Sequence, residues 1–156
     1  MSDLVGKKAP DIKMQASNGK TVSLADFAGK NIVLYFYPKD MTPGCTTQAC
    51  DFRENNQSFA DLDTVILGVS PDPLDKHEKF ITKHSLPFLL LSDADHSLAK
   101  AYDVWVLKKN FGHEYMGMER STFVIDKKGT IVKEWRKVKV KGHVEEALQY
   151  IKENLA

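Results

Sequence analysis

Residues 38–50 read Pro38-Lys39-Asp40-Met41-Thr42-Pro43-Gly44-Cys45-Thr46-Thr47-Gln48-Ala49-Cys50, and this segment contains both cysteines of the chain. It follows a near-continuous apolar run, Asn31 to Tyr37, which is typical of a strand buried on both faces. Thr42-Pro43-Gly44 breaks that strand, and the pattern beyond it predicts a helix from Thr42 or Pro43 to about Ala60. The segment therefore predicts a strand-to-helix turn with Cys45 at the start of the helix.

This turn supplies what an activated thiol needs. Only the thiolate is a good nucleophile, and a free cysteine with a pKa of about 8.5 is mostly protonated at neutral pH. The unpaired N–H groups and the dipole of a helix N-terminus favour the anion. Pro43 suits the first helical position, and Gly44 permits close approach of backbone and substrate. Thr42 suits an N-cap, or it can direct its hydroxyl at the sulfur or at a substrate oxygen. The alternative for Cys45 is a small buried hydrophobe.

Cys50 follows Cys45 by five residues. On an intact α-helix the two Cα atoms would lie roughly 8.5 Å apart, whereas a disulfide needs a Cα separation below about 7 Å. The pair can bond only if the start of the helix unwinds. We therefore expect a helix in the reduced protein and a locally melted turn in the oxidised protein. The alternative for Cys50 is a passive helix residue.

The composition and charge of the chain limit the kinds of partner and location that we expect for it. The chain has 156 residues, of which 42% are hydrophobic and 28% charged, so we expect one soluble domain over residues 1–156. A net charge of +1 gives no reason to expect a nucleic acid or an anionic membrane as partner. Residues 1–10 lack the apolar run of a signal peptide, and no segment approaches the roughly 20 apolar residues of a membrane span. These features predict a cytoplasmic protein.

The cysteine and histidine spacings argue against other kinds of site. A cytoplasmic location makes a structural disulfide unlikely, and the four residues between the cysteines do not match the Cys-x-x-Cys redox pattern. Two thiols cannot form a closed four-cysteine zinc site. His77 and His84 are seven apart on a predicted helix, where a metal pair prefers a spacing of four, so we expect structural or surface histidines.

The remaining pattern alternates between strands and helices. Strands are predicted at 11–14, 21–24, 31–37, 64–70, 88–91, 121–126 and 130–135, and helices at 43–60, 71–84, 97–102 and 143–154. Residues 104–117 have no clear period and are predicted to form a loop that could contain an extra turn. Consecutive βαβ units imply parallel strands, and a hairpin closed by a helix follows. This order predicts a thioredoxin-like α/β fold: a central mixed β-sheet flanked by helices, with an N-terminal β-hairpin and Cys45 at a strand's carboxyl end.

The pattern Pro38-x-x-x-Thr42-x-x-Cys45 resembles the active-site signature of the peroxiredoxins, and Cys50 makes it similar to the peroxiredoxin Q type, also called bacterioferritin comigratory protein. The resemblance covers nearly the whole chain. Further matching motifs are Lys7-Lys8-Ala9-Pro10-Asp11, Tyr35-Phe36-Tyr37-Pro38, Pro43-Gly44-Cys45-Thr46, Leu90-Leu91-Ser92-Asp93, Val104-Trp105 and Arg120-Ser121-Thr122-Phe123-Val124-Ile125-Asp126.

The resemblance implies a mechanism. Cys45 would attack the O–O bond of a hydroperoxide and become a sulfenic acid, while Thr42 and Arg120 hold the peroxide and stabilise the moving charge. Pro38 would shield the site from water. Cys50 would condense with the sulfenic acid to an intramolecular disulfide, as in an atypical two-cysteine peroxidase. Thioredoxin or a glutaredoxin-like dithiol would then reduce it. The family needs no metal or organic cofactor, and many members of this type are monomers.

Arg120 also fits this role from its chemistry alone. It precedes a predicted strand and cannot lose its charge, so its planar fork can steady both a thiolate and peroxide oxygens; the alternative is a surface arginine in an ion pair. Two other classes stay open: a general thiol–disulfide oxidoreductase, and a non-enzymatic redox-responsive protein on the same fold. The missing Cys-x-x-Cys argues against the first of these. Residues 105–112 could shape the rim of the substrate pocket.

Overall fold

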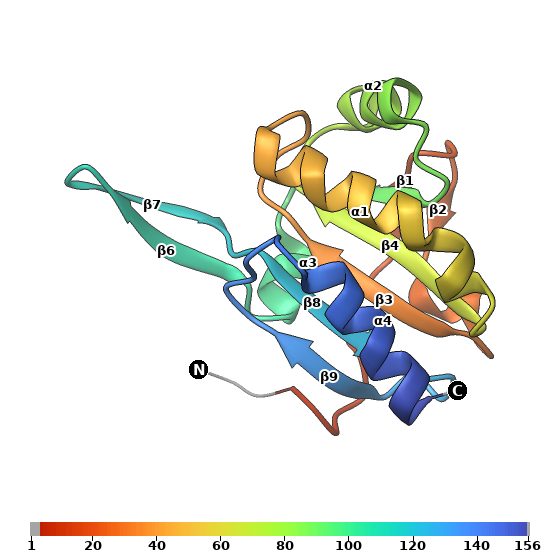
Figure 1. The fold of residues 1–156 in the computed structure, drawn as a ribbon. Coiled ribbons are helices and arrows are strands. Elements are labelled where there is room, and N and C mark those ends of the chain that lie inside the picture. The colour runs from red at the N-terminus through yellow and green to blue at the C-terminus, as the bar shows by residue number, and fades with distance from the viewer. Residues whose placement is uncertain (1–3, 156) are drawn as a thin grey trace.

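The computed structural model describes residues 4–155. The predicted domain range of 1–156 and the N-terminal segment 1–10 therefore lie partly outside the described residues. Within residues 4–155 a seven-stranded sheet with the order β2-β1-β5-β4-β3-β8-β9 lies between helices (Figure 1). Its strands are β1 Met14–Ala16, β2 Thr21–Val22, β3 Asn31–Phe36, β4 Thr64–Ser70, β5 Leu89–Ser92, β8 Ser121–Ile125 and β9 Ile131–Trp135. The helices are the short 3-10 helix η1 Leu24–Phe27 and the α-helices α1 Pro43–Ala60, α2 Leu74–His84, α3 Ser97–Ala101 and α4 His143–Asn154.

The pairing of these strands confirms the predicted thioredoxin-like mixed sheet. β3 pairs in parallel with β4, and β4 in parallel with β5. β8 is antiparallel to β3, and β9 is antiparallel to β8, as the predicted C-terminal hairpin requires. The N-terminal hairpin of β1 and β2 joins the sheet through β5. The C-terminal end of β3, where the cysteine segment begins, therefore lies near the middle of the sheet.

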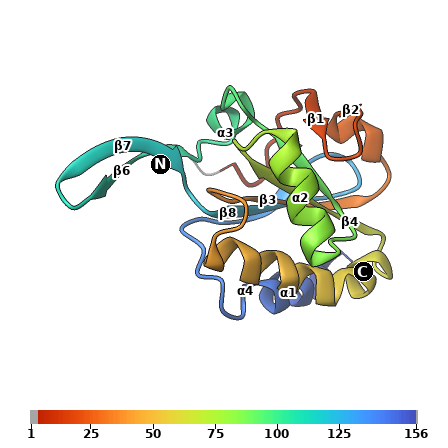
Figure 2. The same cartoon turned by 90° about the horizontal axis from the view of Figure 1, so that it is seen from above.

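From Ile32 to Phe36, β3 carries only apolar and aromatic side chains, because both of its faces are covered. Val33 and Tyr35 pack in the core with side chains of α1 and α4, whereas Leu34 and Phe36 pack in the core on the α3 side. Figure 2 shows α1 and α4 together on one side of the sheet and α3 on the other. A strand buried on both faces loses the alternation of a half-exposed strand, which is why β3 was recognisable as a continuous apolar run.

The prediction of a loop at 104–117 is wrong. β6 (Trp105–Asn110) and β7 (His113–Met118) form a separate two-stranded antiparallel sheet, which projects from the body of the molecule (Figures 1 and 2). Leu107, Tyr115 and Met116 are exposed on it, and Phe111 at its turn is 95% exposed. A hairpin that stands away from the core needs no apolar face, so the sequence lacks the period that marks a strand.

The first hairpin is also shifted from its predicted position. Its first strand begins at Met14 rather than at Asp11. The Asp11 carboxylate instead accepts hydrogen bonds from the backbone N–H groups of Leu24 (2.7 Å) and Ala25 (3.1 Å). These bonds satisfy the free N–H groups at the start of η1, a helix that the sequence did not reveal. None of the helices described combines the length and apolar content of a membrane-spanning segment.

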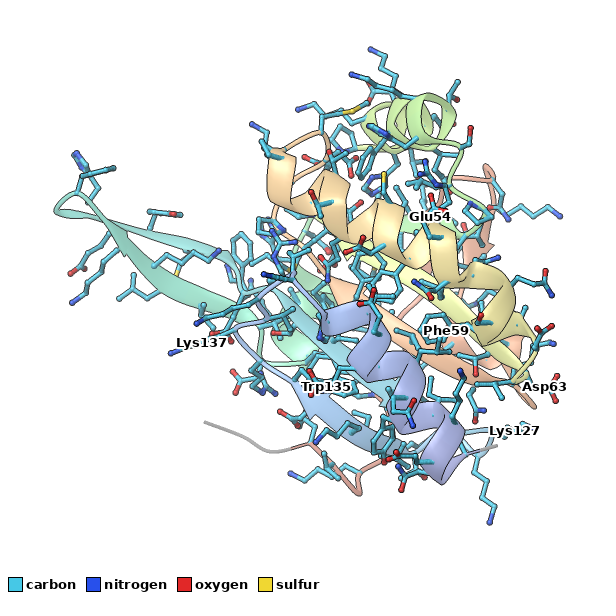
Figure 3. The ribbon with its side chains drawn as sticks, in the orientation of Figure 1. Glu54, Phe59, Asp63, Lys127, Trp135 and Lys137 are labelled. Carbon is cyan, nitrogen blue, oxygen red and sulfur yellow. The ribbon has the colours of Figure 1, made fainter. Side chains whose placement is uncertain are left out.

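Side-chain contacts join elements that are distant in sequence. Asp63, just before β4, pairs with Lys127 (3.2 Å) in the β8–β9 turn and with Lys30 (3.7 Å); Figure 3 shows Asp63 and Lys127 side by side. Trp135 of β9, also labelled in Figure 3, donates from its indole N–H to Glu146 of α4 (3.0 Å). The exposed ion pairs contribute little stability. α4 packs on the sheet mainly through buried apolar side chains, including Val144 and Ile151.

Gly68 of β4 is a point where the core has no room for a side chain. A Cβ there would lie 2.7 Å from Leu90 Cδ2 and 2.9 Å from the Tyr35 hydroxyl oxygen. Tyr35 cannot move aside easily because its ring stacks on Phe52, with centroids 4.6 Å apart. We expect Gly68→Ala to lower the free energy of unfolding by about 1–3 kcal/mol, measured by urea denaturation.

Gly117→Ala is the matched control for this prediction. The closest atom to a Cβ at Gly117 is Cδ of Lys108 (3.0 Å), part of a flexible side chain. Because that chain can move, and because alanine also reduces the entropy of the unfolded state, the control should change stability by less than about 0.5 kcal/mol. Equal stability losses in the two variants would contradict the steric explanation.

Candidate active site

α1 begins directly after the loop that follows β3, as predicted, with Pro43 as its first residue. Thr42 has the extended backbone of an N-cap (φ −80°, ψ 153°), and its carbonyl accepts the first helical bond from the Thr46 N–H (2.8 Å). Its hydroxyl, however, does not bond to a helix N–H and donates instead to the carbonyl of Lys39 (2.9 Å). The side-chain cap that the sequence allowed is therefore not formed.

Cys45 lies in the first turn of α1 with its side chain 2% exposed. Nη2 of Arg120 donates to its Sγ at 3.3 Å. Arg120 immediately precedes β8, the antiparallel neighbour of β3, so the sheet brings together two residues 75 positions apart. A Cβ on Gly44 would lie 3.3 Å from the same Nη2, so glycine leaves the guanidinium room to reach the sulfur. A positive charge and a helix N-terminus both favour the thiolate.

Gln48 completes the contacts of Arg120, and sequence reasoning missed it. Nη1 of Arg120 donates to Gln48 Oε1 at 2.6 Å, and the Gln48 side chain is fully buried. Because residues three apart share a helix face, Gln48 lies on the same side of α1 as Cys45. The two arms of the guanidinium therefore contact Cys45 and Gln48 on the same face of α1. A buried polar residue within the apolar stripe of α1 is the signal that could have identified it.

A buried network holds the loop between β3 and α1 in place. The Asp40 carboxylate accepts from the Tyr37 hydroxyl (2.5 Å) and lies 2.6 Å from Nδ1 of His77 in α2. Nε2 of His77 contacts the Leu91 carbonyl (3.0 Å), and the Asp40 N–H donates to the Asp72 carboxylate (2.5 Å). His77 is thus a structural histidine, one of the two outcomes expected for it. The network fixes the backbone that leads to Thr42.

Three buried polar atoms have no hydrogen-bond partner among the residues described: the Tyr35 hydroxyl, Nε2 of Gln48 and the Ser121 hydroxyl. They come from β3, α1 and β8. α1 contains Cys45, and the pairing of β3 with β8 brings Arg120 to it. Burial, and secondarily the negative charge at Cys45, raises the pKa of Tyr35 well above its usual value. The phenol therefore stays protonated at physiological pH.

Two other predicted site residues, Pro38 and Cys50, lie before and after Cys45 in the sequence. Pro38 is half-buried in the loop between β3 and α1. Cys50 is partly buried further along α1, and its Sγ lies 3.9 Å from Nδ1 of His84. Both cysteines are free thiols, and α1 is continuous from Pro43 to Ala60. The structure is therefore that of the helical, reduced segment.

The β6–β7 hairpin adds a second positive charge near the site. Lys108 of β6 lies across from Tyr115 of β7, and its aliphatic part packs over Gly117. Burial lowers the pKa of the Lys108 ammonium, and the charge of Arg120 lowers it further, while Glu119 and Cys45 act in the opposite direction. The hairpin is thus close enough to the cysteine centre to affect its electrostatics.

His143 at the start of α4 gives a pH-dependent prediction. Its Nε2 contacts the Thr122 hydroxyl at 2.8 Å, and burial lowers its pKa below the usual 6.5, with Glu146 opposing and Arg120 adding to the effect. The unfolded chain therefore binds this proton more readily than the folded one, so acidification below about pH 6.5 destabilises the fold. We expect His143→Gln to lose less stability than the wild type between about pH 7.5 and 5.5, measured by urea unfolding. Identical losses would contradict this assignment.

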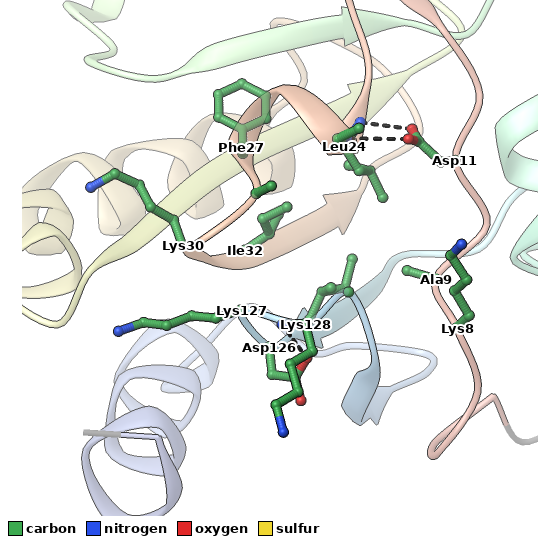
Figure 4. A pocket seen from close by; sticks show the side chains of 14 residues that line it. Lys8, Ala9, Asp11, Leu24, Phe27, Lys30, Ile32, Asp126, Lys127 and Lys128 are labelled. Atoms are coloured by element: carbon green, nitrogen blue, oxygen red, sulfur yellow. Dashed lines mark hydrogen bonds between the residues drawn. The ribbon is translucent and has the colours of Figure 1, made fainter.

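A separate cavity of about 260 Å³ lies at the other end of the sheet, near the start of β3 (Figure 4). Apolar side chains such as Leu24, Phe27 and Ile32 line it, with Lys8 and Lys128 at its edge. It contains neither cysteine and is not part of the thiol site. Among residues 4–155 no group of three or more His, Cys, Asp or Glu side chains is arranged to hold a metal ion.

The family profile, a related sequence and a solved structure all match this chain over most of its length. The sequence profile of the AhpC/TSA family matches residues 5–134. Peroxiredoxin Bcp of Bacillus subtilis is 67% identical over 149 residues, which cover 96% of this chain and 95% of the relative. A solved structure of Xylella fastidiosa PrxQ, a cysteine-to-serine mutant, has a TM-score of 0.94 at 36% identity and covers 100% of both chains.

A structure of the Xanthomonas campestris bacterioferritin comigratory protein, from work on its alkyl peroxide reduction activity with trapped intermediate and ligand complexes, has a TM-score of 0.89 at 40% identity. It covers 93% of this chain and 92% of that one. The sequence identity, the shared fold and the cysteine at the start of α1 agree with one another. The chain belongs to the AhpC/TSA family and, within it, to the peroxiredoxins of the Q or Bcp type.

Proposed function

We propose that this protein is a thiol peroxidase that reduces hydrogen peroxide and organic hydroperoxides to water or alcohols, with Cys45 as nucleophile and Cys50 as its disulfide partner. The observation that carries the proposal is the contact of Arg120 Nη2 with Cys45 Sγ at the N-terminus of α1. It gives the thiolate two sources of positive potential, the guanidinium and the helix dipole.

In the first step, the Cys45 thiolate attacks the terminal oxygen of the hydroperoxide. An S–O bond forms, the O–O bond breaks, and the departing oxygen takes from solvent the proton that the thiol released on ionisation, leaving as water or alcohol. Arg120 stabilises the charge as it moves from sulfur to the departing oxygen, because its charge does not depend on pH and its position is fixed by Gln48. Thr42 already donates its hydroxyl proton to Lys39, so its oxygen is left to accept a hydrogen bond from the peroxide.

Pro38 takes the role of limiting water at the nucleophile. It is half-buried in the loop whose other end carries Thr42, and it has no side-chain polar group or N–H to offer to water. A drier site strengthens each of the charge interactions at the sulfur. The shielding and the peroxide contacts together account for the choice of a peroxide rather than a disulfide as the first substrate.

In the second step, Cys50 condenses with the sulfenic acid of Cys45. The intact helix keeps two residues five positions apart at a Cα separation of roughly 8.5 Å, so the first turn of α1 must unwind before the disulfide forms. The bonds lost are those of the first turn, including Thr46 N–H to Thr42 carbonyl and Thr47 hydroxyl to Pro43 carbonyl. Thioredoxin, or a glutaredoxin-like dithiol, then reduces the disulfide. We place the protein in the cytoplasm as a monomer.

Steady-state peroxide consumption tests this function. Wild-type protein with thioredoxin, thioredoxin reductase and NADPH should consume hydrogen peroxide and cumene hydroperoxide, and omission of thioredoxin should stop turnover after one equivalent. Reduction of insulin without any peroxide would favour a general thiol–disulfide oxidoreductase instead. Peroxide consumption that persists when both cysteines are replaced would refute the thiol mechanism.

A further inference from the structure

The imidazole of His84 lies against the thiol of Cys50. The two residues come from different helices, His84 from the last turn of α2 and Cys50 from α1, and Nδ1 lies 3.9 Å from Sγ. This distance is within reach of a hydrogen bond to sulfur. The predicted alternatives for this histidine, a surface or purely structural residue, do not account for a contact with a reacting atom.

Several contacts keep His84 at this place. Nη1 of Arg53 in α1 donates to the His84 carbonyl at 2.7 Å. The ring of Phe80 meets the imidazole edge-on, with centroids 5.4 Å apart. Ser85 ends α2 in a left-handed conformation, and its N–H bonds back to the Ile81 carbonyl. Because Arg53 lies beyond the first turn of α1, this anchor can persist while that turn unwinds.

Cys50 needs a source of activation that the helix does not supply. A thiol attacks a sulfenic acid as the thiolate, and a free cysteine is mostly protonated at neutral pH. The favourable potential of a helix N-terminus falls off within the first turn, and Cys50 lies beyond it. An imidazole is the side chain best suited to accept a proton between about pH 5 and 8.

We propose that His84 is the general base of the resolving step. Nδ1 accepts the proton of the Cys50 thiol, and the thiolate attacks the sulfur of the Cys45 sulfenic acid. The S–S bond forms, the S–O bond breaks, and the departing hydroxide recovers the proton from the imidazolium and leaves as water. No further oxidant or reductant takes part. This inference rests on the proposed pairing of Cys45 with Cys50.

The surroundings of the pair are compatible with this proton transfer. Arg53, three residues after Cys50 in α1, bonds to Glu54 and interacts electrostatically with Cys50, as does Tyr35 of β3. Arg53 keeps its charge at every accessible pH and favours the thiolate. Burial raises the pKa of Tyr35, so its phenol stays neutral. Neither of these two groups changes charge between about pH 5 and 8, so His84 can dominate the pH dependence of the step.

A single-turnover experiment tests the proposal. Reduced wild type, His84→Asn and the matched control His113→Asn, which alters an exposed histidine at the start of β7, are each mixed with one equivalent of hydrogen peroxide. Samples are quenched at intervals with an alkylating reagent, and intact mass separates thiol, sulfenic acid and disulfide. All three should consume peroxide equally fast, but His84→Asn should form the disulfide about 100-fold more slowly.

The pH profile of the disulfide step is the second readout. Because an imidazole base is available at lower pH than an unassisted thiolate, the rate in wild type should level off at a lower pH than in His84→Asn. Disulfide formation by His84→Asn at the wild-type rate, or the same pH profile in wild type and His84→Asn, would overturn the role of His84. Absence of an intramolecular disulfide in wild type would instead refute the proposed function itself.

Discussion

Replacing Cys45 with serine is expected to lower peroxide reduction by more than about 1000-fold, the scale seen when an enzyme loses its nucleophile. A serine hydroxyl at this position is not ionised by the guanidinium of Arg120 or by the start of α1, and it cannot reach the oxidation states through which the sulfur passes. The measurement is the rate of hydrogen peroxide consumption by the reduced protein.

Cys50→Ser is the control for this result. It leaves Cys45, Arg120 and Gln48 in place, so the first equivalent of peroxide should disappear at the wild-type rate even though continued turnover with thioredoxin fails. If Cys45→Ser kept full activity, or if Cys50→Ser lost the first turnover as well, the assignment of the nucleophile would be wrong.

Replacing Arg120 with methionine should lower the second-order rate constant for peroxide reduction by about 100- to 1000-fold, the range observed when a preorganised charge donor is removed. Methionine fills similar space and has no charge, so the thiolate and the departing oxygen both lose their nearest cation. Rapid mixing of reduced protein with peroxide, followed by thiol titration, measures this rate constant directly.

Arg120→Lys separates charge from geometry. A lysine retains the charge, but it cannot contact both Cys45 Sγ and Gln48 Oε1 as the two arms of the guanidinium do. We therefore expect a rate between those of the wild type and Arg120→Met. A lysine variant as fast as the wild type would show that only the charge matters, and an unaffected methionine variant would remove Arg120 from the mechanism.

Much of the fold follows from local pattern. β3 was recognisable because burial on both faces leaves an unbroken apolar run, and α4 because one apolar stripe packs on the sheet. The start of α1 was identified because the backbone preferences of Thr42, Pro43 and Gly44 suit the beginning of a helix. These features depend on neighbours in the sequence, which is why residues alone indicate them.

The features that were missed depend on contacts between distant segments. The sequence around Gln48 does not indicate a functional role, because that role depends on the contact with the distant Arg120. The link from Asp40 to His77 joins the cysteine loop to α2, and no spacing rule connects positions 37 residues apart. The contact of His84 with Cys50 is of the same kind. Strand residues within 105–117 were predicted as loop because a projecting hairpin has no buried face to impose a period.

The mechanism makes opposite demands on one short segment. The Asp40 network and the Thr42 carbonyl hold the start of α1 in the geometry that brings Cys45 to Arg120. In the proposed mechanism the same turn must open so that Cys45 can reach Cys50. The stable anchors lie on either side of it, in the Asp40–His77 pair before the turn and in the Arg53–His84 contact after it. Opening can therefore stay local to the first turn of α1.

Intact-mass spectrometry under non-reducing conditions, after one equivalent of peroxide, tests the central claim that Cys45 and Cys50 act as a nucleophile and its partner. Wild type should lose two hydrogens and remain a single chain, as an intramolecular disulfide requires. Cys50→Ser should instead gain one oxygen, and further oxygens as Cys45 over-oxidises when more peroxide is added. Disulfide-linked dimers as the main wild-type product, or an unchanged mass in Cys50→Ser, would contradict the account.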